Sequence, residues 1–162
     1  MKTTLYIVAL TFAFISCSQK QQANTAICTS CKNDSIAVIQ TDKDFCNYCS
    51  KHGLSAAFIK YSDSSAIEMG QGKLPVMGNG AVKAAYVKRN DTTTNLYWTP
   101  IKACACGDLA YTFGWWKFPD KTKAGKDTTY YGYYVTIWGK QKDGSWKYVL
   151  DGGNDTPIPP AK

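Results

Sequence analysis

The spacing of apolar residues after Thr41 predicts a helix. Thr41 is a candidate N-cap, and the acidic residues behind it lie where the helix dipole favours negative charge. Apolar side chains then recur at helical spacing, and Gly53 interrupts them, so we expect the helix to bend or split there. The apolar positions are Phe45, Tyr48, Cys49, Leu54, Ala57, Phe58 and Tyr61.

Strand-like runs dense in Tyr, Trp, Val and Thr fill the rest of the chain. Gly70-Gln71-Gly72 is a hairpin signal between two short runs, and a short helix is expected from Ala81 to Val87. The short turns between the later runs indicate an antiparallel meander. The expected strands are 65–69, 74–77, 95–106, 109–118, 129–142 and 145–150. We therefore predict an α+β fold, a cone-shaped and strongly curved antiparallel sheet with helices on its concave face enclosing a pocket.

The first residues predict a signal peptide. Lys2 gives a positive start, and the apolar stretch from Leu5 to Ile15 is too short to span a bilayer. The stretch ends at Ser16-Cys17, which is similar to the lipoprotein boxes of Gram-negative bacteria. We expect residues 1–16 to be removed and Cys17 to carry a lipid that anchors the protein to a membrane of the bacterial cell envelope. Ordinary cleavage with a free Cys17 is the alternative.

The composition after Cys17 predicts a tether. The segment Ser18–Thr25 is polar and of low complexity, so it cannot bury enough apolar surface to order itself. We interpret residues 17–40 as the lipidated cysteine and a flexible tether. The folded domain is then expected over residues 41–154, with a surface tail over 155–162.

Charge argues against a nucleic-acid partner. The chain carries 19 basic and 12 acidic residues, for a net charge of +7, but the lysines are scattered and Arg89 is the single arginine. Nucleic-acid binding calls for Lys and Arg clustered on one face. We expect no nucleic-acid binding.

Aromatic residues make up 14% of the chain and concentrate in the predicted sheet. Alternation along 109–118 puts the odd-numbered aromatic residues on one face and Trp116 and Phe118 on the other. One face is expected to meet the pocket and the other could meet a second subunit, but periodicity does not fix which parity faces inward. Our prediction for the pocket lining is Trp98, Tyr111, Trp115 and Tyr133.

Three segments carry a resemblance to a known family: GDLAYTFG (107–114), YVTIW (134–138) and DGSWK (143–147). With their surroundings, from about Asp42 to Asn154, they resemble the nuclear transport factor 2-like superfamily, and most of all its bacterial ketosteroid-isomerase-like (SnoaL-like) branch of undefined function. The resemblance implies a cone-shaped domain with a deep pocket, often dimeric through the outer sheet face. It does not fix an activity, because this fold hosts isomerases, dehydratases, plain binders and assembly domains.

Two function classes use such a pocket. A plain binder would take up a small apolar or aromatic molecule. A ketosteroid-type isomerase needs a carboxylate base in an apolar pocket and an oxyanion hole built from a tyrosine and a protonated acid. Candidates are Tyr48 as hydroxyl donor, with Asp151 and Glu68, the sole glutamate, as acids. Asp151 could equally cap a turn before Gly152, and Glu68 could face water.

Cysteines give a third hypothesis, a thiol or zinc protein. Beyond Cys17 they form three close pairs: Cys28 and Cys31, Cys46 and Cys49, Cys104 and Cys106. The first two pairs have the spacing of a four-thiolate zinc site. An oxidising compartment favours disulfides instead, and unpaired thiols are a further alternative. Zinc aside, no cofactor is expected, and the lone His52 is expected at an exposed helix end.

Overall fold

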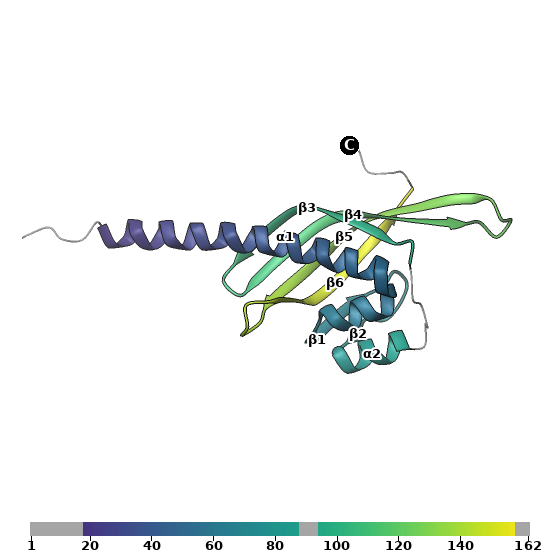
Figure 1. Ribbon diagram of the computed structural model, residues 1–162, viewed down its shortest axis with the longest axis horizontal. Coiled ribbons are helices and arrows are strands. Elements are labelled where there is room, and N and C mark those ends of the chain that lie inside the picture. Colours follow the sequence, from purple (N-terminus) through teal and green to yellow (C-terminus); the bar gives the residue numbers. More distant parts are fainter. Residues whose placement is uncertain (1–17, 88–93, 158–162) are drawn as a thin grey trace, which may run out of the picture.

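The computed structural model describes residues 18–87 and 94–157, with side chains in the first helix described from Cys31 onward. Two helices and six strands follow one another along the chain (Figure 1). They are α1 (Ser18–Tyr61), β1 (Ser62–Met69), β2 (Val76–Met77), α2 (Asn79–Val87), β3 (Tyr97–Cys106), β4 (Leu109–Lys121), β5 (Asp127–Lys140) and β6 (Trp146–Thr156).

The six strands form one open sheet in the order β2-β1-β6-β5-β4-β3. Neighbouring strands are antiparallel except β1 and β6, which pair in parallel, so the sheet is mixed. Strand β1 lies between β2, which pairs with it antiparallel, and β6, the last strand of the chain, which pairs with it in parallel. With two helices packed on this sheet, the predicted α+β cone fold is confirmed, and the expectation of a purely antiparallel sheet is corrected.

Helix α1 begins at Ser18, whereas the sequence predicted a helix from Thr41 and a tether before it. The segment just before Thr41 belongs to the packed domain: Val38 is fully buried, and the amide of Ala105 donates to Ser35 Oγ at 3.0 Å. Asp34 also pairs with Lys140 of β5 at 2.7 Å. The predicted break at Gly53 is confirmed, since this residue has φ 85° and ψ 163° inside the helix.

Strand β6 continues to Thr156, well beyond its expected end at Leu150. Gly152 and Gly153 were the reason to expect a turn, but both pair with β5. A Cβ on Gly153 would lie 2.3 Å from the carbonyl oxygen of Tyr133, so glycine is required there by the close approach of the two strands. Asp151 consequently lies inside a strand.

The core joins the helices to the inner face of the sheet. Phe45 of α1 packs against the rings of Phe58, Tyr61 and Trp98, with centroids 4.8–4.9 Å away. Trp138 is fully buried in the same cluster. These contacts fix α1 over the sheet.

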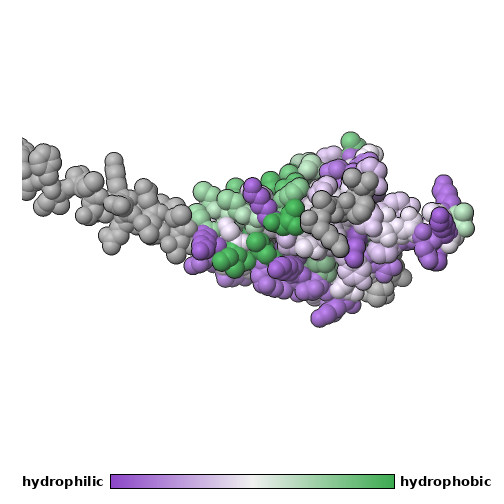
Figure 2. All heavy atoms as spheres, turned by 90° about the horizontal axis from the view of Figure 1, so that it is seen from above, coloured by the Kyte–Doolittle hydropathy of each residue, from purple (hydrophilic) through white to green (hydrophobic). Residues whose placement is uncertain are grey.

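Some apolar surface stays open to solvent. Among the exposed residues, Ile101 and Leu109 are both 57% accessible and Phe113 is 36% accessible. Seen from above, apolar side chains gather near the emerging N-terminal part of α1, and hydrophilic ones cover the far end (Figure 2). No described helix is long and apolar enough to cross a membrane.

Candidate functional site

A cavity of about 470 Å³ opens between α1 and the inner face of the sheet. Apolar side chains from three elements form most of its wall: Phe45, Leu54 and Phe58 on α1, Trp98 on β3, and Trp116 and Phe118 on β4. A few polar side chains face it from β5 and β6, among them Tyr134, Thr136 and Asp151. An apolar cavity with a few convergent polar groups is the usual form of a small-molecule site.

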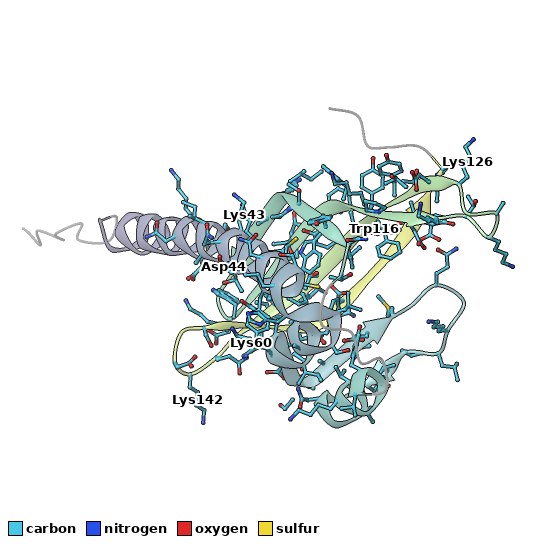
Figure 3. The ribbon with its side chains drawn as sticks, turned by 45° about the vertical axis from the view of Figure 1, so that its right-hand side comes forward. Lys43, Asp44, Lys60, Trp116, Lys126 and Lys142 are labelled. Carbon is cyan, nitrogen blue, oxygen red and sulfur yellow. The ribbon has the colours of Figure 1, made fainter. Side chains whose placement is uncertain are left out.

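Glycines opposite aromatic residues shape this cavity. In the register of β4 and β5, Trp116 lies opposite Gly132, and Tyr134 lies opposite Gly114. A Cβ on Gly132 would lie 2.4 Å from the Trp116 ring, and one on Gly114 would lie 2.7 Å from the Tyr134 ring. The two rings therefore lie over the glycines, against the sheet. Figure 3 shows Trp116 within the body of the molecule, while Lys126 and Lys142 extend outward.

Asp151 and Asp155 both line the cavity, and Asp151 is the less exposed of the two. Thr136, its partner on β5, donates a hydrogen bond from Oγ1 to Asp151 Oδ2 at 2.6 Å. Burial raises the pKa of Asp151 to about 7; the nearby charges of Glu68 and Asp42 add to the rise, and the Thr136 hydrogen bond opposes it. A carboxyl group with such a pKa exchanges its proton near neutral pH, as a general acid or base must.

Glu68 lies behind Asp151, outside the residues that line the cavity. It is the register partner of Asp151 across the parallel β1–β6 pair. The hydroxyl of Tyr148 donates to Glu68, and this interaction adds to burial in raising the pKa of Tyr148. Its place in the structure makes Glu68 a neighbour that tunes Asp151 through charge.

A second buried acid, Asp42 on α1, holds two of the cavity walls in place. Trp98 Nε1 donates to Asp42 Oδ1 at 2.7 Å, and the Tyr134 hydroxyl donates to Oδ2 at 2.8 Å. Burial raises the pKa of Asp42, while hydrogen bonds from Thr112, Tyr134 and Trp98 oppose the rise. The cluster ties α1, β3 and β5 together at the cavity floor.

Sequence reasoning missed Asp42 because it placed the residue in the first turn of a helix, where an acid faces the dipole. The helix begins much earlier, and Asp42 is then four residues after Val38 and three before Phe45. Those positions share one helical face. The helical spacing of Asp42 from the apolar residues Val38 and Phe45 was the signal that could have identified it as a buried acid.

Comparison with known proteins gives the fold but no close relative. No family model matches the chain, and no curated protein matches it. Among solved structures, a ketosteroid isomerase-like protein from Erwinia carotovora atroseptica superimposes with a TM-score of 0.64 at 17% identity, over 78% of this chain and 99% of that one. The fold is nuclear transport factor 2-like.

Two further structures agree. A nuclear transport factor 2-like protein with a cystatin-like fold from Novosphingobium aromaticivorans has a TM-score of 0.62 at 11% identity, covering 86% of this chain and 91% of that one. A nuclear transport factor 2-like superfamily protein from Salmonella enterica serovar Typhimurium has a TM-score of 0.60 at 12% identity, covering 81% and 94%. The TM-scores support the nuclear transport factor 2-like fold, and the low identities leave the activity open.

The nuclear transport factor 2-like sheet turns the even-numbered residues of β4 and β5 toward the cavity. Of the four aromatic residues expected to line it, Trp98 does so. Tyr111, Trp115 and Tyr133 lie on the opposite face, where Tyr133 stacks on Phe113 with ring centroids 5.7 Å apart. The prediction for β4 and β5 was therefore wrong: it placed the odd-numbered residues in the cavity, but the helices cover the face that carries the even-numbered ones.

Tyr48, the expected hydroxyl donor, lies on α1 away from the cavity lining. Its ring lies against that of His52, tilted by 31° with centroids 4.2 Å apart, and Lys60 Nζ lies 3.8 Å from the Tyr48 ring centroid. His52 is exposed, as the sequence predicted. Tyr130 and Tyr134, both on β5, line the same cavity as Asp151.

The structure does not bring the two Cys-x-x-Cys pairs together. Cys31 and Cys46 lie on one helix, and their fifteen-residue separation corresponds to about 22 Å along its axis. Cys46 accepts a hydrogen bond from the Trp98 amide, and burial raises its pKa, which keeps it a thiol. Across the described side chains, no three potential metal ligands converge.

The other cysteines fall into two groups. Cys17, and the side chain of Cys28, lie outside what the structure describes. Cys104 and Cys106 are both exposed on the edge strand β3. Cys28, Cys31, Cys46 and Cys49 are carried by one helix. The four thiolates could surround a single zinc ion only if that helix broke between Cys31 and Cys46.

Proposed function

We propose that this protein binds a small apolar or aromatic molecule in the cavity between α1 and the sheet. The observation that carries the proposal is the cavity itself, about 470 Å³ with aromatic walls contributed by several elements. Its walls are braced by the buried Asp42 hydrogen bonds to Trp98 and Tyr134, which favours a preformed site over one that must reorganise.

Binding is tested with N-phenyl-1-naphthylamine, a neutral aromatic probe whose fluorescence rises in apolar surroundings. The variant Trp116→Ala removes an aromatic side chain from the cavity wall. The matched control, Trp115→Ala, removes the neighbouring tryptophan, whose side chain lies on the other face of β4. Loss of one aromatic contact is expected to weaken binding about tenfold in Trp116→Ala and hardly at all in Trp115→Ala. Equal affinities for the two variants, or no binding by the unmodified protein, would contradict the proposal.

A second function is supported by Asp151, whose pKa of about 7 suits proton transfer in the same cavity. In that case the carboxylate would take a proton from carbon next to a substrate carbonyl and return it at another carbon, giving isomerisation, or assist loss of water. Deuterium uptake at the α-carbon of cyclohexanone, followed by NMR, tests it. Asp151→Asn should abolish the uptake, and Asp108→Asn, on an exposed turn away from the cavity lining, should retain it.

The location that best suits this function is the bacterial cell envelope, with the domain anchored to a membrane by lipid on Cys17. The support is the apolar stretch followed by Ser16-Cys17. Detergent phase partitioning of the full chain made in a Gram-negative host tests this placement. The unmodified chain should enter the detergent phase, and Cys17→Ala should stay in the aqueous phase; both chains in the aqueous phase would exclude the anchor.

A further inference from the structure

In the described part of the chain, every charged side chain that lines the cavity is acidic. Asp151 faces the cavity, Asp155 lies at its rim, and Glu68 and Asp42 lie close enough to raise the pKa of Asp151. Among the described residues, no Lys, Arg or His lines the cavity, although the chain carries 19 basic residues and a net charge of +7. A basic protein therefore keeps an acidic binding site.

The described lysines that pair with acids or rings do so elsewhere. The two ion pairs join Lys121 to Asp127 and Lys140 to Asp34. Lys60 lies over the ring of Tyr48, outside the cavity lining. None of these contacts compensates the acids at the cavity.

The cavity walls also suit a positive charge. Trp98, Trp116 and Tyr130 line it together with Phe118 and Phe45. The faces of such rings attract cations, indole most strongly, and the attraction grows where water is excluded. Carboxyl groups beside aromatic faces attract a cation by two separate interactions.

We propose that the ligand of this cavity is an organic ammonium, a positively charged nitrogen that carries an apolar or aromatic group. The nitrogen would lie near Asp151 and the apolar group against Trp98 and Trp116. This inference deepens the proposed binding function and rests on it. One cation would offset the mutual repulsion of Asp151, Glu68 and Asp42, which neither a neutral ligand nor an anion can do.

The pH dependence of binding follows from the groups around Asp151. Glu68 faces it from β1, Asp42 from α1, and the hydroxyls of Tyr134 and Thr136 from β5. An ammonium prefers the ionised carboxyl, so its affinity should rise with pH through about 7 and then level off. A neutral ligand that accepts a hydrogen bond from the protonated carboxyl would show the opposite trend.

The experiment uses three probes of similar size and different charge: benzyltrimethylammonium, neopentylbenzene and benzylsulfonate. Quenching of intrinsic tryptophan fluorescence reports binding to the full folded chain. We expect the cation to bind at least about tenfold more tightly than the neutral probe, and the sulfonate to bind most weakly. Asp151→Asn should bring the cation and the neutral probe within about threefold of one another, while Asp108→Asn, the same charge change on an exposed turn, should leave the preference intact.

The outcomes distinguish a failure of the ammonium proposal from a failure of the proposed binding function. Equal binding of cation and neutral probe, tighter binding of the sulfonate, or a cation affinity that falls as pH rises would overturn the ammonium ligand and leave the binding cavity standing. If the three probes and N-phenyl-1-naphthylamine all fail to bind, the proposed function fails and the inference with it. The pH profile is measured on the unmodified protein, so the result does not depend on how well Asp151→Asn folds.

Discussion

Asp151 is costly to the folded protein at neutral pH. Its pKa is about 7 in the folded state, against 3.8 for an unperturbed aspartate. The folded protein thus holds the proton more tightly than the unfolded chain does. The free energy of unfolding is therefore highest below pH 4, falls as the pH rises to about 7, and is constant above that as far as Asp151 is concerned.

Asp151→Asn should remove this loss of stability at neutral and higher pH. The variant keeps the shape of the side chain but cannot ionise, so its free energy of unfolding should exceed that of the unmodified protein by a few kcal/mol at pH 8, and by about 4 kcal/mol at most. At pH 4 the two should be nearly equal. Urea unfolding at both pH values checks this, with Asp108→Asn as control. A variant that is less stable at pH 8 would show that the carboxylate is well solvated or paired.

At the scale of single residues, the sequence identified only one of the two buried acids, Asp151 and Asp42. Asp151 could be selected because it follows an apolar strand, although its place inside β6 depended on the pairing of Gly152 and Gly153 with β5. Asp42 could not be selected once the helix was assumed to begin at Thr41. A buried acid becomes visible only when the apolar residues on both sides of it are assigned to one helical face.

At the scale of the elements, the stretch of α1 just before Thr41 is a packed part of the domain. Val38 is fully buried, and Ile36, two residues earlier, is 59% exposed. Val38→Ala should lower the free energy of unfolding by about 2 kcal/mol, because it leaves a cavity. Ile36→Ala should change it by less than about 0.5 kcal/mol. Urea unfolding of both variants measures the difference, and similar small effects would mean that residues before Thr41 behave as a tether after all.

The pairing of β4 with β5 depends on glycine beneath Trp116. In Gly132→Ala the new Cβ would lie 2.2 Å from the carbonyl oxygen of Asn154 and 2.4 Å from the Trp116 ring. We expect a loss of about 1–3 kcal/mol in unfolding free energy and displacement of the indole toward the cavity, seen as weaker binding of N-phenyl-1-naphthylamine. Gly80→Ala in α2, where no atom lies within 4 Å, is the control. Unchanged stability in Gly132→Ala would show that the strands can separate there.

Element types could be predicted from the sequence, but the inward face could not. Period-two alternation is symmetric, so it places Tyr111 and Thr112 on opposite faces without saying which one the helices cover. A register shift between Pro100 and Lys102 further changes the parity along β3. The face is decided by where α1 packs, which is a contact between segments far apart in the chain.

At the scale of the whole molecule, the outer sheet face is the surface expected to meet a second copy. Phe113 and Tyr133 stack there, and Leu109 is 57% exposed. If two copies associate through this face, Phe113→Lys should give a monomer, because a charge in an apolar interface must be desolvated without a partner. Sedimentation velocity of this variant and of the control Ile36→Lys, away from the sheet, measures the effect. A monomeric unmodified protein, or equal dissociation in both variants, would exclude the interface.

Helix α1 begins one residue after Cys17, and its part before the break at Gly53 spans residues 18–52, about 52 Å of rise along one axis. If the lipid is attached at Cys17, this helix sets both the distance of the cavity from the membrane and the direction in which the cavity faces. Removing seven residues from the helix between Ser18 and Cys31 would bring the cavity closer to the membrane but leave it facing within about 20° of its original direction. Removing two would turn it by about 200°, so the direction of the cavity mouth can be changed with little change in its height.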